Sequence, residues 1–173
     1  MIPAEFTECY ELQLAAYKKN RNPGHAERVA DLRTLHRMLV DNHDALVAAV
    51  NKDFGCRCAF ETKFAETFMA QDATLDAIKH LKKWMKPIRR HLDPTQFPLA
   101  RAWTFPQPVG VVGVVVPWNF PIAMAFQPLI GIIAAGNRAM IKMSENSNHL
   151  ALLLKQISPK YFPRDKLAFF EDA

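Results

Sequence analysis

The feature that most constrains the fold is the apolar run Val-Gly-Val-Val-Gly-Val-Val-Val at residues 109–116. β-Branched residues favour extended chain, and a continuous apolar strand is typical of a parallel sheet that is covered on both faces. Pro117 ends the run. The sequence therefore predicts a buried parallel strand at this position, and with it an α/β fold.

The residues after this strand alternate between helix and strand patterns. An apolar helix is predicted over 121–135, ended by the Gly-Asn pair at 136–137, and a short strand follows over 139–143. Ser144 is expected to cap the next helix, and residues 167–170 have the pattern of a third strand. This order predicts the start of a doubly wound parallel sheet. Three strands are too few to complete a typical open sheet, so we expect a truncated domain.

The residues before residue 90 carry helix patterns. Apolar residues recur at helical spacing within 29–39, 46–54 and 60–85. Gly55 stands where the second of these helices needs a left-handed residue, and Pro87 ends the third. The first half of the chain is therefore predicted to be helical.

The segment 91–108 differs from both of its neighbours. It contains four prolines that exclude a helix, Pro94, Pro98, Pro106 and Pro108. Apolar and polar residues partly alternate between 99 and 105. Because proline is tolerated in edge strands and not in central ones, we expect exposed extended chain or edge strands here.

Composition and charge exclude several classes of protein. Half of the 173 residues are hydrophobic, which is enough for a buried core and argues against disorder. The net charge is +5, and the densest basic group is Lys79, Lys82, Lys83, Lys86, Arg89 and Arg90. A solvent-exposed helix face is the preferred interpretation of this group, with attraction of phosphate as the alternative. We therefore expect no nucleic-acid partner.

Disulfides, metal sites and membrane spans are not expected. The three cysteines, Cys9, Cys56 and Cys58, form neither a disulfide framework nor a metal-ligand cluster. The N-terminus lacks a basic region followed by an apolar core, and the longest apolar stretch, 109–116, is too short to cross a bilayer. These features predict a cytoplasmic protein with no membrane partner.

The segment Pro-Trp-Asn-Phe-Pro at 117–121 follows the first predicted strand of the parallel sheet and precedes a helix. In open α/β sheets, ligands bind at this end of the strands. The side-chain amide of Asn119 could stabilise negative charge that develops on a carbonyl oxygen. Two simpler interpretations stay open, in which Asn119 only caps the following helix and Trp118 belongs to the core.

The segment Lys-Met-Ser-Glu at 142–145 occupies the same place after the second strand. Lys142 could donate hydrogen bonds to ribose hydroxyls and Glu145 could accept them, so that a nucleotide crevice would lie between the two strand ends. The alternative is a lysine at a strand end beside a helix whose first turn carries a favourable glutamate. The chain contains no glycine-rich dinucleotide or phosphate-binding fingerprint.

Together these motifs resemble the aldehyde dehydrogenase superfamily. The run from Pro108 to Pro121 is similar to a signature of that family, and the segments 127–129, 134–137 and 141–145 follow in its order and spacing. The resemblance is strong over about 103–154 and weak before it. The stretch Lys-Met-Ser-Glu-Asn is most similar to coniferyl aldehyde dehydrogenases.

The resemblance implies an α/β organisation in three parts. Residues 1–90 would be the N-terminal helical part of the cofactor domain, 91–108 an extended oligomerisation arm, and 109–173 the truncated start of a Rossmann-like NAD-binding domain. The arm would reach a neighbouring subunit and cover otherwise open strand edges, which implies a homo-oligomer.

The resemblance also implies roles for individual residues. Asn119 would be catalytic, as a donor to the oxyanion. The residues expected to bind the cofactor are Val115, Val116, Pro117, Trp118, Lys142, Ser144 and Glu145. A carboxylate at Glu145 would repel a 2′-phosphate, so NAD is expected, with NADP as the alternative. The residues expected to line the substrate site, on one helix face, are Phe120, Ala123, Met124 and Gln127.

The implied activity is oxidation of an aldehyde, coniferyl or another aromatic aldehyde, to the carboxylic acid. The family's nucleophilic cysteine and general-base glutamate lie far downstream of residues 142–145, and this chain contains neither. We therefore expect an N-terminal portion of the enzyme that is inactive alone. The alternative is a non-catalytic module that binds nucleotide or takes part in assembly.

Overall fold

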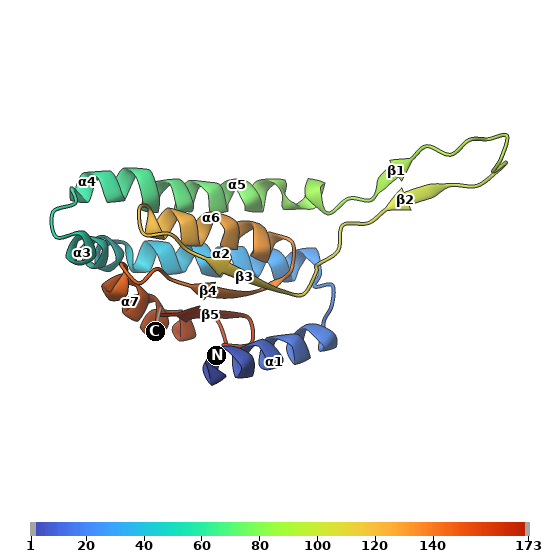
Figure 1. The fold of residues 1–173 in the computed structure, drawn as a ribbon. Helices are drawn as coiled ribbons and strands as arrows, with labels where there is room; N and C mark the ends of the chain where they lie inside the picture. The colour runs from blue at the N-terminus through green and yellow to red at the C-terminus, as the bar shows by residue number, and fades with distance from the viewer. Residues whose placement is uncertain (1–2, 172–173) are drawn as a thin grey trace.

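The computed structural model describes residues 3–171 and has a mixed α/β fold, in which helices precede a three-stranded parallel sheet (Figure 1). The α-helices are α1 (Ala4–Lys19), α2 (His25–Asp41), α3 (His43–Phe54), α4 (Ala59–Thr62), α5 (Met69–Trp84), α6 (Pro121–Ala134) and α7 (Asn148–Ile157). A π-helical turn, η1 (Lys63–Phe68), joins α4 to α5, and a 3-10 turn, η2 (Ser158–Lys160), follows α7. The strands are β1 (Ile88–Arg90), β2 (Ala102–Thr104), β3 (Val111–Val115), β4 (Arg138–Lys142) and β5 (Leu167–Phe170). Across residues 3–171, no helix combines the length and apolar character that a membrane span requires.

The parallel sheet has the strand order β3-β4-β5, and α6 and α7 connect successive strands. Val115 pairs with Lys142, which in turn pairs with Phe170. All three strands therefore end at the same edge of the sheet. The three strand patterns that follow residue 108 are confirmed to within two residues at each end.

Different helices cover the two faces of the sheet. Phe169 of β5 points into the main core, where its ring lies 6.1 Å from that of Phe126 on α6. The next residue, Phe170, stacks on Phe6 of α1 with ring centroids 4.2 Å apart. Because successive residues of a strand point to opposite faces, α6 covers one face of the sheet and α1 covers the other.

The sequence analysis assigned no individual pattern to helix α1. Its fully covered residues are only Cys9 and Gln13, so the helix carries little apolar periodicity. Gln13 Nε2 donates hydrogen bonds to the carbonyl oxygens of Ala139 and Arg164, over 2.9 and 3.1 Å. Polar contacts with the backbone therefore help to fix α1 against the sheet, and a search for apolar stripes does not detect them.

The expectation that the valine run is covered on both faces is wrong for β3. Val115 is 78% exposed, and Gly113 is exposed as well. The Tyr17 hydroxyl at the end of α1 donates to the Pro108 carbonyl oxygen, so α1 reaches the chain just before β3 and leaves the carboxyl end of the strand uncovered. Among the described residues, β3 also pairs with one strand only. By contrast, every residue of β5 is buried.

The helix patterns within 29–39 and 46–54 are confirmed as α2 and α3, and Gly55 has the left-handed φ of 76° that a helix end favours. The third pattern forms a continuous helical path from α4 to α5. The π-helical turn in the middle of this path was not predicted.

The predicted apolar stripe along α5 is partly wrong. Leu75 and Trp84 are about half exposed. Leu81 of the predicted stripe is buried as expected, and the other buried residues of this helix are Ala70, Thr74 and Ala77. Three of these four side chains are small, which lets α5 pack closely on α2 and α6.

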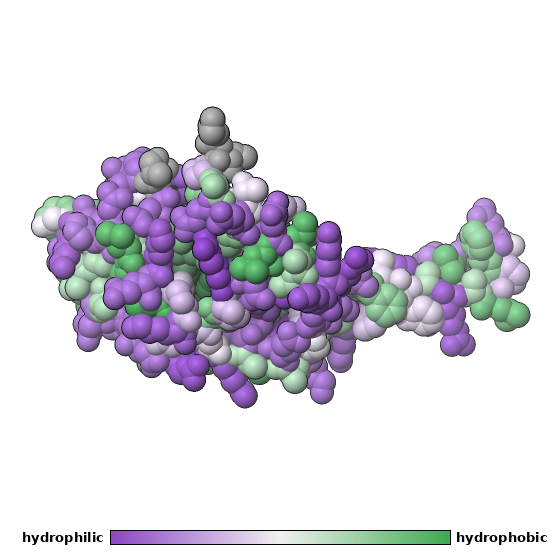
Figure 2. Space-filling view, turned by 90° about the horizontal axis from the view of Figure 1, so that it is seen from below, coloured by the Kyte–Doolittle hydropathy of each residue, from purple (hydrophilic) through white to green (hydrophobic). Residues whose placement is uncertain are grey.

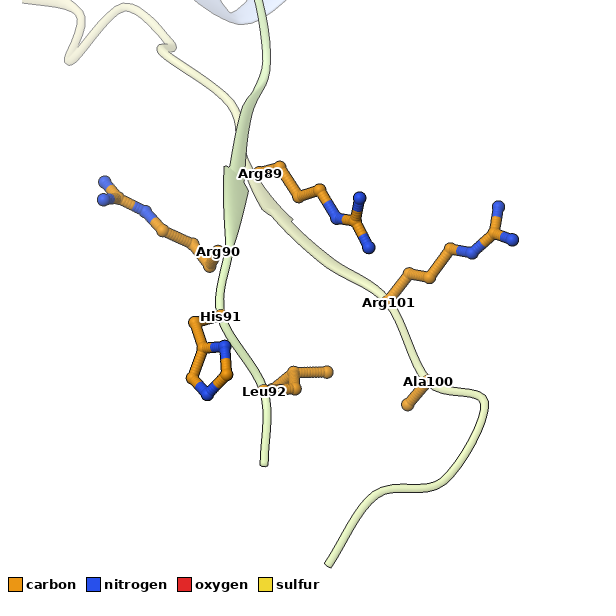
Figure 3. A pocket seen from close by; sticks show the side chains of 6 residues that line it. All are labelled: Arg89, Arg90, His91, Leu92, Ala100 and Arg101. Atoms are coloured by element: carbon orange, nitrogen blue, oxygen red, sulfur yellow. The ribbon is translucent and has the colours of Figure 1, made fainter. Parts of the chain in front are cut away.

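Strands β1 and β2 form an antiparallel hairpin that projects from the body of the molecule (Figures 1 and 2). Its pairing begins with Ile88 opposite Thr104, so the extended region starts before residue 91, and Arg89 and Arg90 belong to a strand. A shallow pocket on the hairpin is lined by Arg89, Arg90, His91, Leu92, Ala100 and Arg101. Figure 3 shows that Arg89 and Arg101 extend to the same side of it.

Candidate site at the carboxyl ends of the parallel strands

The two motifs singled out in the sequence meet at the carboxyl edge of the sheet. Val115 and Lys142 are register partners, and the backbone N–H of Val116 donates to the Lys142 carbonyl oxygen over 2.9 Å. Among the residues expected to bind a cofactor, those with exposed side chains are Val115, Pro117, Trp118 and Glu145. Val116 and Ser144 are buried, and Lys142 is half-buried. The structure thus brings both segments to one side of the molecule.

Asn119 lies in the loop between β3 and α6, and its side chain is exposed. Within residues 3–171 its carboxamide makes no hydrogen bond. The N-cap residue of α6 is Phe120, and its side chain makes no hydrogen bond to the helix. The interpretation of Asn119 as a helix cap is therefore wrong, and its amide group is available to a ligand.

The cap of α6 comes from a residue that the sequence analysis missed. Glu66, on the π-helical turn η1, is fully buried, and its Oε2 accepts hydrogen bonds from the backbone N–H groups of Ile122 and Ala123 over 2.8 and 3.1 Å. Burial raises the pKa of the Glu66 carboxyl, although these hydrogen bonds and Arg57 oppose that shift. A glutamate inside a long helix pattern gives no signal of which distant helix it will cap.

Arg57 is a second residue that the sequence analysis did not assign to the site. Its Nη1 donates to the carbonyl oxygen of Asn119 over 2.7 Å, and its Nη2 lies 3.3 Å from Glu66 Oε1. The guanidinium stands between two aromatic rings, with its central carbon 4.7 Å from the centroids of both Phe54 and Phe120. The sequence showed Arg57 only as the residue between two cysteines.

The cap predicted for the second crossover helix is wrong. α7 begins at Asn148, four residues after Ser144, and the Ser144 hydroxyl instead accepts a hydrogen bond from the backbone N–H of Asn146 over 3.2 Å. The carboxylate of Asp53, at the end of α3, accepts hydrogen bonds from the N–H groups of the first turn of α7. Ser144 therefore shapes the turn after β4, and a distant aspartate caps the helix.

The residues expected to line a substrate site are only partly on the surface. Met124 is 37% exposed and Gln127 is exposed, whereas Phe120 is half-buried. Ala123 is only 3% exposed and lies beside Glu66, to which its backbone N–H donates. The exposed part of this face of α6 is therefore formed by Met124 and Gln127.

Comparison with known proteins identifies the family of this chain. The model of a family described as "Aldehyde dehydrogenase family" matches residues 3–169. A probable coniferyl aldehyde dehydrogenase of Pseudomonas aeruginosa is 44% identical over 90% of this chain and 33% of its own length. A coniferyl aldehyde dehydrogenase of a Pseudomonas species is 41% identical over 81% of this chain and 28% of its own length. The chain thus spans about a third of the length of these curated relatives.

Solved structures share the fold at lower sequence identity. The substrate-bound state of Staphylococcus aureus AldH superposes with a TM-score of 0.91 over 97% of this chain and 36% of that protein, at 24% identity. The indole-3-acetaldehyde dehydrogenase AldA of P. syringae, as a C302A mutant in complex with NAD+ and IAA, superposes with a TM-score of 0.83 over 97% of this chain and 33% of that protein, at 22% identity. These likenesses establish the fold.

Proposed function

This chain belongs to the aldehyde dehydrogenase family, and on that premise we propose that it contributes an oxyanion donor and part of the cofactor site to an NAD(P)-dependent aldehyde dehydrogenase. The three strands would be the first strands of a Rossmann-like doubly wound sheet. The chain spans about a third of the relatives it matches, so the remaining parts of the site would lie in other parts of the protein.

The observation that carries this proposal is the exposed carboxamide of Asn119. Glu66 occupies the capping role at α6, so the structure of the helix does not require the Asn119 side chain. An amide donor at the carboxyl end of a parallel strand is suited to stabilise a carbonyl oxygen that becomes negative. We propose that the Asn119 Nδ2 group donates to that oxygen after a cysteine elsewhere in the protein has attacked the aldehyde carbon.

The exposed edge of the sheet is proposed to bind one end of a dinucleotide. The side chains of Val115 and Trp118 offer an apolar surface beside the strand ends, and the Glu145 carboxylate is exposed in the turn after β4. We propose that Glu145 and Lys142 hold the adenine ribose and that Glu145 disfavours a 2′-phosphate, so NAD is the preferred cofactor. When bound, NAD would supply the hydride acceptor for the oxidation.

The substrate is proposed to be an aromatic aldehyde. The two curated relatives described above are named as a probable coniferyl aldehyde dehydrogenase and a coniferyl aldehyde dehydrogenase. The side chains of Phe120, Met124 and Gln127 follow one another along α6 from the Asn119 loop. The buried Ala123 would lie behind them, on the side of the protein interior. Such a face combines an aromatic ring with a flexible apolar side chain and one polar group.

The β1–β2 hairpin is proposed to pair with a second subunit. The hairpin projects from the rest of the molecule, and its residues are largely exposed. Replacing the hairpin tip, residues 91–101, with a short turn should lower the mass measured for the complete protein by light scattering. An unchanged mass would exclude this segment as the oligomer contact.

The function is tested by Asn119→Ala in the complete enzyme. Loss of one oxyanion donor typically lowers kcat by about a hundredfold to a thousandfold, and NAD affinity should stay nearly the same because Asn119 is not among the residues proposed to hold the cofactor. Asn51→Ala, which removes a carboxamide from the exposed side of α3, is the matched control. Unchanged turnover in Asn119→Ala would remove this residue from the mechanism and favour a non-catalytic nucleotide-binding or assembly module.

A further inference from the structure

The loop that carries Asn119 is held on both sides by one pair of residues. Arg57 binds the carbonyl oxygen of Asn119, and Glu66 binds the backbone N–H groups of Ile122 and Ala123. Arg57 Nη2 and Glu66 Oε1 are themselves 3.3 Å apart. The two contacts therefore fix the backbone immediately before and after Phe120 relative to each other.

Arg57 has little freedom to move. It is buried, and its guanidinium is stacked between the rings of Phe54 and Phe120. A second carboxylate, that of Glu61, lies 3.5 Å from the same Nη2 atom that faces Glu66. An arginine whose guanidinium is stacked between two aromatic rings and contacted by two carboxylates is a rigid support for the carbonyl that it binds.

The pair is costly as a stabilising device. Within the described residues, Arg57 Nε and Nη2 and Glu66 Oε1 are buried without a hydrogen bond of good geometry, although the ionic contact between the two groups is short. A buried ion pair often stabilises a fold no better than apolar residues of the same volume. The Arg57–Glu66 pair lies against the loop that carries the proposed oxyanion donor. This location indicates that the pair serves to hold that loop in place. Glu66 also lies on a π-helical turn, a form that is frequent at functional sites.

We propose that Arg57 and Glu66 are positioning residues that hold the Asn119 amide in the orientation needed to donate to the substrate oxygen. This inference rests on the proposed function. Arg57 acts through the Asn119 carbonyl, and Glu66 acts through the first turn of α6. Neither side chain needs to touch the aldehyde or the cofactor.

The test is a double-mutant cycle in the complete enzyme. Arg57→Met should lower kcat by about tenfold to a hundredfold, since small misplacement of a catalytic group has effects of this size, while KM and NAD affinity change little. In an Asn119→Ala background the same substitution should have no further effect on kcat, because the group that it positions is gone. An equal loss of kcat in both backgrounds would overturn the proposal.

Glu66 provides a second approach to the same loop. Glu66→Gln keeps an oxygen that can accept from Ile122 and Ala123 and should retain most of kcat, whereas Glu66→Ala should lower it as Arg57→Met does. If Arg57→Met lowers the yield of folded protein, this pair of variants still decides the outcome. Equal kcat in Glu66→Ala and the wild type would contradict the inference.

A matched control is Arg28→Met at the other end of α6. Arg28 is buried like Arg57 and donates to the carbonyl oxygens of Pro23 and Ala134, but it lies away from the Asn119 loop. Its replacement should lower the melting temperature without changing kcat. Loss of kcat in Asn119→Ala but not in the Arg57 and Glu66 variants would contradict this inference and leave the proposed function standing. No loss in Asn119→Ala would instead sink the proposed function.

Discussion

The carboxylate of Asp53 caps the helix that contains His149, with Oδ1 lying 2.8 Å from both the backbone nitrogen and the ring Nδ1 of that histidine. The second oxygen of Asp53 accepts from the N–H of Leu150 over 3.0 Å. Glu66 binds the first turn of α6 in the same way. Both helices that leave the candidate site are thus capped by carboxylates from helices earlier in the chain.

Removal of the Asp53 cap should weaken the start of α7. Asp53→Ala leaves the N–H groups of His149 and Leu150 without their acceptor, and loss of an N-cap costs about 0.5–2 kcal/mol. Asp53→Asn keeps one acceptor oxygen and should lose less. Urea unfolding of the complete protein measures the change, and hydrogen exchange at Leu150 locates it. Slow exchange at Leu150 in the alanine variant would show that other contacts hold this turn.

Replacing either of two neighbouring glycines, Gly131 and Gly136, with alanine should change the stability of the protein, but in opposite directions. Gly136 has a φ of +83°, and an added Cβ would lie 2.8 Å from Pro23 Cγ and 2.9 Å from Arg28 Cζ. Gly136→Ala should therefore destabilise the protein by more than about 1 kcal/mol. Gly131 lies inside α6, and apart from its chain neighbours and the backbone of its own helix no atom lies within 4 Å of such a Cβ, so Gly131→Ala should stabilise by about 0.5–1 kcal/mol. Thermal melting of both variants checks the pair, and shifts of the same sign would contradict it.

The three cysteines should differ sharply in reactivity. Cys56 and Cys58 are exposed, whereas Cys9 is 1% exposed, and burial raises the pKa of its thiol. Because the thiolate is the reactive form, Cys9 carries less of it at a given pH than an exposed thiol. Brief iodoacetamide treatment at pH 8 should modify Cys56 and Cys58 and spare Cys9 until the protein unfolds. Peptide mass mapping reads the order, and early modification of Cys9 would show that α1 detaches from the sheet.

The buried Glu66 carboxyl should give the protein a pH-dependent stability. Burial is the largest cause that raises its pKa above the ordinary 4.5, and the nearby Glu61 adds to this while Arg57 opposes it. The folded state then keeps a proton that the unfolded state releases. The stability from this group is therefore full below about pH 4.5 and is lost as the pH rises through the folded pKa.

Glu66→Gln removes this titration. The difference in unfolding free energy between the variant and the wild type should shift in favour of the variant as the pH rises from 4.5, the ordinary pKa of the group. Urea unfolding at several pH values between 4 and 7 measures the difference. A constant difference would mean that Arg57 fully compensates for the burial of the carboxylate.

The sequence predicted those elements whose signal is local. The valine run, the apolar helix after Pro121 and the left-handed Gly55 each have a short-range cause, and each was located correctly. The exposed carboxyl end of β3 could not be predicted, because it depends on how far α1 extends across the sheet. Local pattern does not contain that information.

Some residues of the candidate site could likewise be predicted from the sequence, and others could not. Asn119 and Glu145 stand next to strand ends that the sequence identifies, so their position followed from the strands. Arg57 and Glu66 reach the Asn119 loop from 62 residues and from 56 residues away. No periodicity relates residues at such separations, and only the packing of η1 against α6 and the path of the segment between α3 and α4 reveal the link.

The π-helical turn at Lys63–Phe68 makes chain length in this region as important as residue identity. Such a turn holds an extra residue compared with the α-helical path on either side of it. Deleting one residue from the turn would let the segment relax to an ordinary α-helix, in which each residue turns the chain by about 100°. Glu66 would then rotate away from α6 while every side chain that surrounds the site kept its chemistry. A relative one residue shorter in this region would thus need another means of supporting the start of α6, even at high sequence identity.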